Sequence, residues 1–342
     1  MSKTGRRILL LLVSVSLAAC GTTQSQKVRF TGSVPIRSDQ DYANWPVEPL
    51  KAALLMQEAK YKVLSVEPAG SGTTRPEKAE ILFPETGDKF YVKGKLVSHS
   101  LDGINNSPRK ELAAWQLQTL FLEPVDFVVP ATVLRCLPLQ RWRDNHNGKG
   151  TPIIPGTKCM LSDVTIWMEN VTVPDELYEE ERFLNDLNYA YHLANFNILA
   201  YLINLRDNRK GNVLVSKDAN NRRVFAVDNG VSFGTIWYNW FYPPTYSWRE
   251  ISVPALPQKS IDRLRKLRRE DLDFLMVVSQ LEVDADGMLR TVQASAPIDP
   301  EQGAQREGTT VQFGLTEDEV EDVWERIEEL IEQVDEGEIT LF

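Results

Sequence analysis

Two short stretches decide the predicted fold: NLRDNRKGN at residues 204–212 and VDNG at residues 227–230. The first holds Asp207 and, five residues later, Asn212, and the second holds Asp228. Magnesium prefers oxygen ligands, and a usual protein share at a nucleotide is one carboxylate and one amide oxygen from separate loops. Asp228 and Asn212 fit that share, whereas Asp207 is placed to orient or deprotonate an acceptor hydroxyl. The two stretches therefore predict a Mg²⁺ (or Mn²⁺) site beside a phosphoryl acceptor.

The hydrophobic pattern around these stretches supports a hairpin. An apolar helical run ends at residue 203, a polar loop covers 206–211, and strands are predicted over 213–215 and 224–227 with a turn between them. Both candidate metal ligands then flank one hairpin. Asp and Asn are also ordinary turn residues on surface hairpins, so the order of the upstream elements decides between the two interpretations.

Upstream, the pattern predicts strands over 61–66, 79–83 and 89–97. The loop between the first two contains Gly70, Ser71, Gly72 and Thr73. Glycine lets backbone amides approach phosphate oxygens without a Cβ in the way, so this loop is the candidate phosphate loop.

The third strand and the helix after it supply a candidate ion pair. Alternate strand residues share a face, which brings Lys93 and Lys95 to one side. Ser107 is a good N-cap and Pro108 a good first residue for a helix that holds Glu111 in its first turn. Spacing does not separate the two lysines as partners of Glu111, and we favour Lys93. Glu111 could also simply complement the helix dipole.

This order of residues resembles the atypical branch of the protein-kinase-like superfamily, in particular the secretory-pathway Golgi kinases, the phosphoinositide kinases and the HipA-type kinases. The resemblance covers roughly residues 60–235. It implies that Lys93 and Glu111 clamp the nucleotide, with Lys95 beside them, and that Gly70 to Thr73 contact its phosphates. Asp207 would be the catalytic aspartate, and Asn212 and Asp228 the metal ligands. Residues 167–171, which include Glu169 and Val171, would be the hinge over which adenine stacks. Its co-substrate would be ATP or another nucleotide.

The N-terminus carries an independent signal. Basic residues precede an apolar run over 8–17 that is too short to span a membrane and leads into Leu-Ala-Ala-Cys at 17–20. That tetrad resembles a bacterial lipobox, which implies a signal peptide over 1–19, lipid on Cys20 and a tether over 20–45. Because Gly21 stands after Cys20 in place of Asp, the resemblance to lipoproteins of Gram-negative bacteria implies the outer membrane, with the protein facing the periplasm or the cell exterior.

Two further cysteines suit an oxidising compartment. Cys136 and Cys159 lie in strand-like segments joined by a polar insert. If the strands pair, the thiols could form a disulfide, and two buried free cysteines are the alternative.

The composition limits the partners. With 42% hydrophobic residues the chain can bury a large core, and a net charge of -10 argues against nucleic acid as a partner. An acidic C-terminal helix is predicted from Thr316, with apolar residues at helical spacing that would dock it on the core, and the basic segment 260–269 is a predicted amphipathic helix.

The sequence thus predicts an α+β, two-lobed protein-kinase-like fold, with a strand-rich N-lobe over 46–170 and a mainly helical C-lobe over 171–342. The predicted function is an ATP- and Mg²⁺-dependent phosphotransferase that acts on a hydroxyl of a protein, sugar or lipid at the cell envelope. The alternatives are a catalytically inactive pseudokinase-like lipoprotein that binds a ligand or partner, and a plain envelope scaffold.

Overall fold

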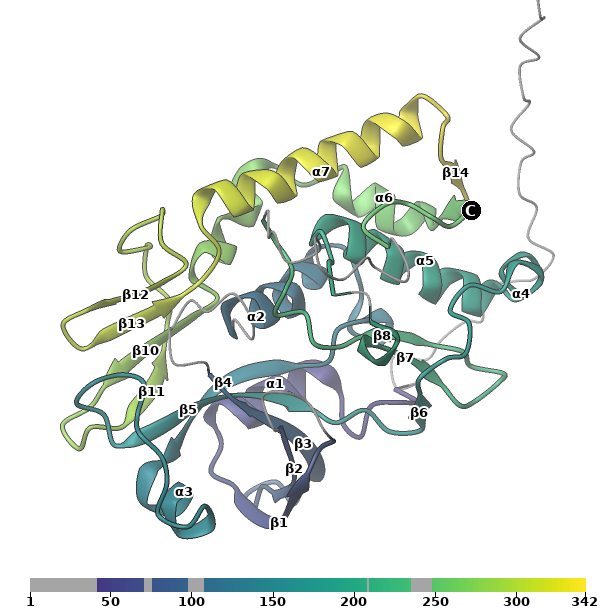
Figure 1. Cartoon of the computed structure of the whole chain (residues 1–342). Coiled ribbons are helices and arrows are strands. Elements are labelled where there is room, and N and C mark those ends of the chain that lie inside the picture. Colours follow the sequence, from purple (N-terminus) through teal and green to yellow (C-terminus); the bar gives the residue numbers. More distant parts are fainter. Residues whose placement is uncertain (1–41, 71–75, 98–107, 208, 235–247) are drawn as a thin grey trace, which may run out of the picture.

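The first sheet has five strands that pair only in antiparallel fashion, in the order β1-β2-β3-β5-β4. A computed structural model describes residues 42–70, 76–97, 108–207, 209–234 and 248–342 (Figure 1). Alternation sets the two faces of the sheet: Phe90 and Val92 are buried on one side of the third strand, while Lys93 and Lys95 lie on the other. The strands are β1 (Lys62–Pro68), β2 (Glu77–Leu82), β3 (Lys89–Leu96), β4 (Thr132–Pro138) and β5 (Cys159–Ile166).

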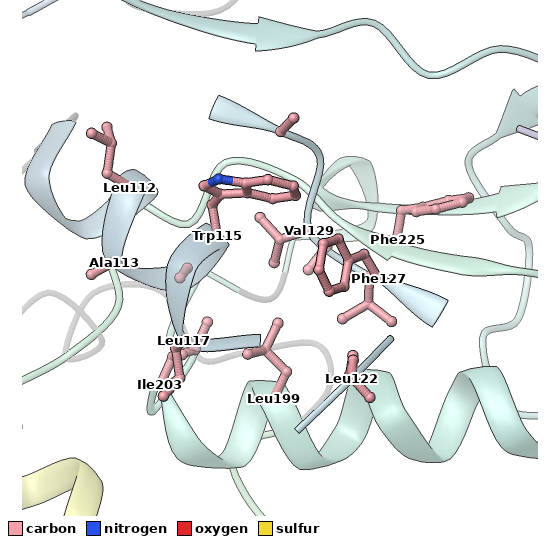
Figure 2. Packing of buried hydrophobic residues seen from close by; sticks show 14 of the residues in the cluster. Leu112, Ala113, Trp115, Leu117, Leu122, Phe127, Val129, Leu199, Ile203 and Phe225 are labelled. Atoms are coloured by element: carbon pink, nitrogen blue, oxygen red, sulfur yellow. The ribbon is translucent and has the colours of Figure 1, made fainter. Parts of the chain in front are cut away.

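Three helices belong to this half of the chain: α1 (Pro49–Glu58), α2 (Pro108–Leu117) and α3 (Leu139–Asn145). Short 3₁₀ helices, η1 (Gln118–Leu120) and η2 (Pro124–Asp126), follow α2. Helix α2 begins at Pro108, as the sequence predicts, and nearly all of its residues are buried. Trp115 of α2 packs edge to face on Phe127, with ring centres 5.2 Å apart (Figure 2). The aromatic pair anchors α2 in the core.

The second half of the chain is built around α5 (Leu187–Leu202), which is buried on all sides and is capped by Asp186. Leu199 and Ile203 belong to the same hydrophobic cluster as Leu117 and Leu122, so one core joins α5 to the segment after α2 (Figure 2). The remaining elements are α4 (Glu180–Asn185), η3 (Lys210–Asn212), α6 (Gln258–Leu264), η5 (Arg269–Val277), α7 (Glu317–Asp335), a parallel pair of β9 (Ala255–Leu256) with β14 (Thr340–Leu341), and the antiparallel sheet β6 (Val171–Thr172), β7 (Val213–Ser216) and β8 (Val224–Ala226). Strands β7 and β8 are the predicted hairpin.

The α+β class is confirmed, and residues 279–313 of the second half hold strands that the sequence did not predict. These residues form an antiparallel sheet, β11-β10-β13-β12, from β10 (Ser279–Val283), β11 (Leu289–Val292), β12 (Ala304–Glu307) and β13 (Thr310–Phe313). Turns at Gly287 (φ 79°) and Gly308 (φ 57°) join its hairpins. The sheet also contacts the first one, since the Leu289 amide donates to Cys136 Sγ at 3.4 Å. Strands from the two halves of the chain therefore pack together.

Two expectations, about the tether and about the basic segment 260–269, need correction. Asn44 and Trp45, which the prediction places in the tether over 20–45, are buried, and Trp45 packs edge to face on Phe225 with ring centres 6.0 Å apart. The predicted helix over 260–269 ends at Leu264, and η5 begins at Arg269. Cys20 and the signal segment 1–19 lie outside the described residues. Within the described ranges, no helix is both long and apolar enough to cross a membrane.

The predicted acidic helix is present as α7. Thr316 and Glu319 form a capping box at its start, and Val320, Val323, Ile327, Leu330 and Val334 are buried along one side. Arg265 and Arg269 of the basic segment pair with Asp335 and Glu321 on this helix. Its apolar stripe and its ion pairs together dock α7 on the core.

A disulfide joins Cys136 on β4 to Cys159 on β5, with Cα atoms 5.3 Å apart and 23 residues of separation in the chain. Closing a loop of this length stabilises the folded state by about 3 kcal/mol in the chain-entropy model. We expect a variant with Cys136→Ser and Cys159→Ser to lose about that much free energy of unfolding in urea titrations. A double variant as stable as the wild type under oxidising conditions would contradict this.

Candidate functional site

Lys95 lies at the centre of a buried charge cluster. Its Nζ is 2.8 Å from Asp228 Oδ1, 3.1 Å from Glu111 Oε1 and 3.8 Å from Asp163 Oδ2. The lysine paired with Glu111 is therefore Lys95, and the choice of Lys93 for that role is wrong. Both lysines point to the same side of β3, but Lys95 lies opposite Asp163 in the strand register, whereas Lys93 lies two residues away, opposite Thr165.

The three carboxylates set the charge states of the cluster. Burial opposes the charged form of Lys95, yet Glu111, Asp163 and Asp228 outweigh it and raise the pKa of the ammonium group. Burial also disfavours the charged form of Asp228, but Lys95 and Lys93 overcome this and lower the pKa of Asp228 to about 2. Asp228 is thus an ionised carboxylate facing a permanent cation.

Asp163 was not identified from the sequence. It is buried on β5, and burial raises the pKa of its carboxyl group to about 7 even though Lys95 opposes the shift. Its signal was available, because it is the only charged residue in the strand CMLSDVTI. A lone carboxylate in such a buried strand requires a partner.

Glu111 connects α2 to the turn after β8. Its Oε1 accepts from Lys95, and its Oε2 accepts from the Asn229 backbone amide at 2.8 Å. Asp228, one residue earlier, has a left-handed backbone (φ 63°), which is uncommon for a residue other than glycine and concentrates at functional sites. One carboxylate therefore fixes both the strand lysine and the position of Asp228.

These residues face a cleft of about 670 Å³, a size in the usual range for small-molecule sites. Its charged lining includes Lys93, Lys95, Glu111, Asp163, Glu169 and Asp228. The predicted hinge, residues 167–171, forms another wall together with apolar side chains from Val129, Ile166 and Leu214. The cleft thus combines an apolar wall with a charged end.

The hinge is held from outside the cleft by Asn44. The Glu169 amide donates to Asn44 O at 3.1 Å, and Asn44 Nδ2 donates to Glu169 O at 3.1 Å. Because both backbone groups of Glu169 are engaged, its side chain and the neighbouring residues are the groups left to contact a ligand. Val171 also lines the cleft and begins β6.

Asp207 and Asn212 lie beside the cleft and are not among its lining residues. Arg209 donates to both carboxylate oxygens of Asp207, at 2.7 and 2.6 Å. Asn212 Nδ2 donates to Asp207 O at 3.1 Å, and Asn212 O accepts from the Val227 amide at 2.9 Å. Asn212 Oδ1 is therefore the amide atom that remains for a cation. In the described part of the chain, no group of three or more His, Cys, Asp or Glu side chains could hold a metal ion by itself.

The candidate phosphate loop begins at the cleft edge. Ala69 lines the cleft, its amide donates to Pro76 O at 2.8 Å, and Gly70 has a left-handed backbone (φ 98°). Ser71, Gly72 and Thr73 lie outside the described residues.

Helix α7 holds α2 in place through Glu319, a contact that the sequence did not predict. Glu319 binds the guanidinium of Arg109 through both carboxylate oxygens and lies 3.3 Å from Lys110 Nζ. Lys110 also donates to Phe233 O at 2.8 Å. Arg109, Lys110 and Glu111 are consecutive, so the first two hold the helix and the third reaches the cleft.

Comparison with known proteins adds no family: no protein-family model matches the chain, and a search of curated proteins finds no match. Function is therefore inferred from the site itself.

Breaking the α7–α2 contact should destabilise the protein. Glu319→Ala removes a carboxylate that Arg109 and Lys110 share, and the side chains of these two cations are only 6% and 8% exposed. Removing one partner of a buried ion pair costs roughly 3 kcal/mol, and we expect that loss in the free energy of unfolding from urea titrations. Asp318→Ala, an exposed neighbour on the same turn, is the control and should cost well under 1 kcal/mol. Equal losses in the two variants would contradict the assignment.

The raised pKa of Asp163 predicts a particular dependence of stability on pH. The folded carboxyl has a pKa of about 7 and the unfolded one about 3.8, so the folded state holds its proton more tightly. The contribution is fully present below about pH 4 and is lost as pH rises through 7. The free energy of unfolding of the wild type, minus that of Asp163→Asn, should therefore fall between pH 4 and pH 8. A difference that stays flat or rises over this range would refute the prediction.

Proposed function

We propose that this chain adopts a two-lobed kinase-like arrangement and is an ATP- and Mg²⁺-dependent phosphotransferase that acts on a hydroxyl group. The observation that carries the proposal is the convergence of Lys95, Glu111 and Asp228 on one cleft. They come from a strand, the following helix and the turn after a later hairpin, which is the order in which protein kinases place their phosphate lysine, its glutamate and a metal-binding aspartate. The first sheet with α1 and α2 would be the N-lobe, and the chain after residue 170 the C-lobe.

In this proposal Lys95 contacts the α and β phosphates, and Glu111 holds it in place. A triphosphate brings negative charge to a cluster that already contains Glu111, Asp163 and Asp228. A divalent cation would offset that charge, with Asp228 and Asn212 Oδ1 as its protein ligands. Lys95, which pairs with Asp228 in this structure, would then hold the phosphates, and Asp228 would hold the cation. Residues 167–171 would contact the base.

Asp207 would serve the acceptor. The acceptor oxygen forms a bond to the γ-phosphorus while the bond from that phosphorus to the β-phosphate oxygen breaks, and Asp207 receives the hydroxyl proton. Arg209 at present occupies both oxygens of Asp207, but its side chain is 68% exposed. The Asp207 side chain is only 8% exposed, so the solvent-facing guanidinium is the member of the pair that would move aside for an acceptor hydroxyl.

The same Asp207–Arg209 contact favours the alternative, a catalytically inactive pseudokinase-like binding module. If Arg209 stays on Asp207 when nucleotide binds, the cleft holds a ligand without phosphoryl transfer. Binding and transfer therefore need separate measurements.

The proposed place of action is the bacterial cell envelope, with the protein anchored to the outer membrane by lipid on Cys20. The support is the lipobox-like sequence at 17–20 and the disulfide between Cys136 and Cys159, which suits an oxidising compartment.

Nucleotide binding provides the test. The purified protein should gain thermal stability only when ATP and Mg²⁺ are both present, because a ligand that binds only the folded state stabilises it by mass action, by about 2.7 kcal/mol at one hundred times its Kd. Asp228→Ala should abolish the gain by removing the anionic metal ligand. Asp207→Ala should keep the gain and lose transfer of the γ-phosphoryl group from radiolabelled ATP to protein or water.

The control is Glu85→Ala, which removes an exposed carboxylate from the β2–β3 turn and should behave as the wild type. No stabilisation of the wild type at millimolar Mg²⁺–nucleotide would overturn the proposal. Stabilisation with no transfer, unchanged by Asp207→Ala, would support the pseudokinase-like alternative.

A further inference from the structure

A second cavity, of about 740 Å³, lies on the other face of the first sheet, between the strands and helices α1 and α3. No residue lines both this cavity and the nucleotide cleft. The separation follows from strand alternation: Val92 and Gly94 of β3 face the cavity, whereas Lys93 and Lys95 face the cleft. The cavity is therefore a distinct site, which the proposed phosphoryl transfer does not use.

The cavity floor is aliphatic. It is formed by Ala79 and Ile81 of β2, Val92 of β3 and Val164 of β5. Ser162, a polar residue of the lining, already donates its hydroxyl to backbone carbonyls of Lys95 and Asp163. A floor of this kind offers few hydrogen bonds to a sugar or a polar peptide, and it suits a hydrocarbon chain.

The lip of the cavity is apolar as well. Leu64 and Val66 of the edge strand β1 line it and are 47% and 48% exposed. Large aliphatic side chains are costly to leave in water, so covering them favours binding. An apolar ligand that entered over this lip would cover both.

Two cations at the cavity have no carboxylate partner among the described residues. Arg141 of α3 makes no ion pair there, and Arg135 of β4 donates to the carbonyls of Gln57 and Ala59 and lies 5.1 Å over the Tyr61 ring. The carboxylates in the lining are engaged: Glu67 with Lys78 at 3.2 Å, Glu77 with His146 at 2.8 Å, and Asp144 with the amide of Gln140 at 2.8 Å. Among the charged side chains of this lining, Arg141 is the one for which the described residues show no hydrogen-bonding or ion-pair partner.

The wall that carries Arg141 is well ordered by its own contacts. Trp142 stacks on His146 with ring centres 3.6 Å apart, and His146 binds Glu77 of β2. These contacts join α3 to the sheet. Arg141 therefore lies on a helix that is fixed to the sheet, next to the aliphatic floor of the cavity.

We propose that this cavity binds a long-chain carboxylate, with its hydrocarbon chain on the floor of the sheet and its carboxylate at Arg141. An apolar body matches the floor and lip, and a single anionic head group matches the unpaired guanidinium. The ligand is a free long-chain fatty acid by chemical class. The proposal goes beyond the phosphotransferase proposal and does not depend on it.

The test is calorimetric titration of the purified full chain with sodium dodecanoate below its micellisation concentration. Saturable binding is expected, with much weaker binding of hexanoate, dodecanol and dodecyltrimethylammonium. Arg141→Ala should weaken dodecanoate binding by about tenfold, the effect of losing one charge-assisted hydrogen bond. Lys149→Ala removes an exposed positive charge just after α3 and should leave binding unchanged.

Two further variants test the place of binding. Ala79→Phe fills the floor and should abolish binding. Leu64→Asp puts a negative charge on an exposed lip position, where folding should tolerate it. It should weaken binding at least as much as Arg141→Ala. If the wild type shows no saturable binding of dodecanoate, the proposal is overturned. The same holds if binding is absent because residues 21–41 of the chain fill the cavity. Equal binding of dodecanol and dodecanoate, or binding that survives Leu64→Asp and Arg141→Ala, would also overturn it. Nucleotide-dependent stabilisation is read separately, so failure of one proposal leaves the other standing.

Discussion

The buried ammonium group of Lys95 is the constraint on which the rest of the described structure depends. With 5% of its side chain exposed, the charge has lost its water, and such a loss costs several kcal/mol unless partners replace it. The partners come from three places in the chain: Glu111 from α2, Asp163 from β5 and Asp228 from the turn after β8. Satisfying one lysine therefore requires that a strand pair, a helix and a distant hairpin all take their positions.

That requirement extends outward from the cleft. Glu111 can reach Lys95 only if α2 is held in its position against the first sheet. Arg109 and Lys110, on the same turn as Glu111, bind Glu319 of α7 and so help to hold α2 there. The C-terminal helix is thus part of the support for the charge cluster, although it is more than two hundred residues from Lys95 in sequence. The sheet over 279–313 supports the first sheet from another side through Leu289 and Cys136. The two halves of the chain share one core, so they do not behave as independent units.

Local signals predicted a large part of this arrangement, and the failures have physical reasons. Strand alternation and helix capping placed β3, the hairpin β7–β8, the start of α2 and the α7 helix correctly. Alternation puts Lys93 and Lys95 on the same face, so it carries no information about which one Glu111 reaches, and that depends on the register of β3 with β5. The Glu319 contact was not predictable, because it joins segments 210 residues apart. The sheet β10–β13 was missed although Asp-Gly at 286–287 is a strong hairpin signal, because its strands are only four or five residues long.

The two faces of the first sheet carry opposite chemistry, and the same two strands build both. On β3, Gly94 faces the aliphatic cavity and Lys95 faces the charged cleft; on β5, Ser162 and Asp163 are divided in the same way. The Ser162 hydroxyl donates to Lys95 O at 3.0 Å, so a side chain of the cavity holds the backbone of the central lysine. A ligand that displaced β3 or β5 from the cavity side would move Lys95 or Asp163 as well. If both proposed ligands bind, the effect of the cavity ligand on the affinity for nucleotide must equal the effect of nucleotide on the affinity for the cavity ligand, because binding free energies around a closed cycle are reciprocal.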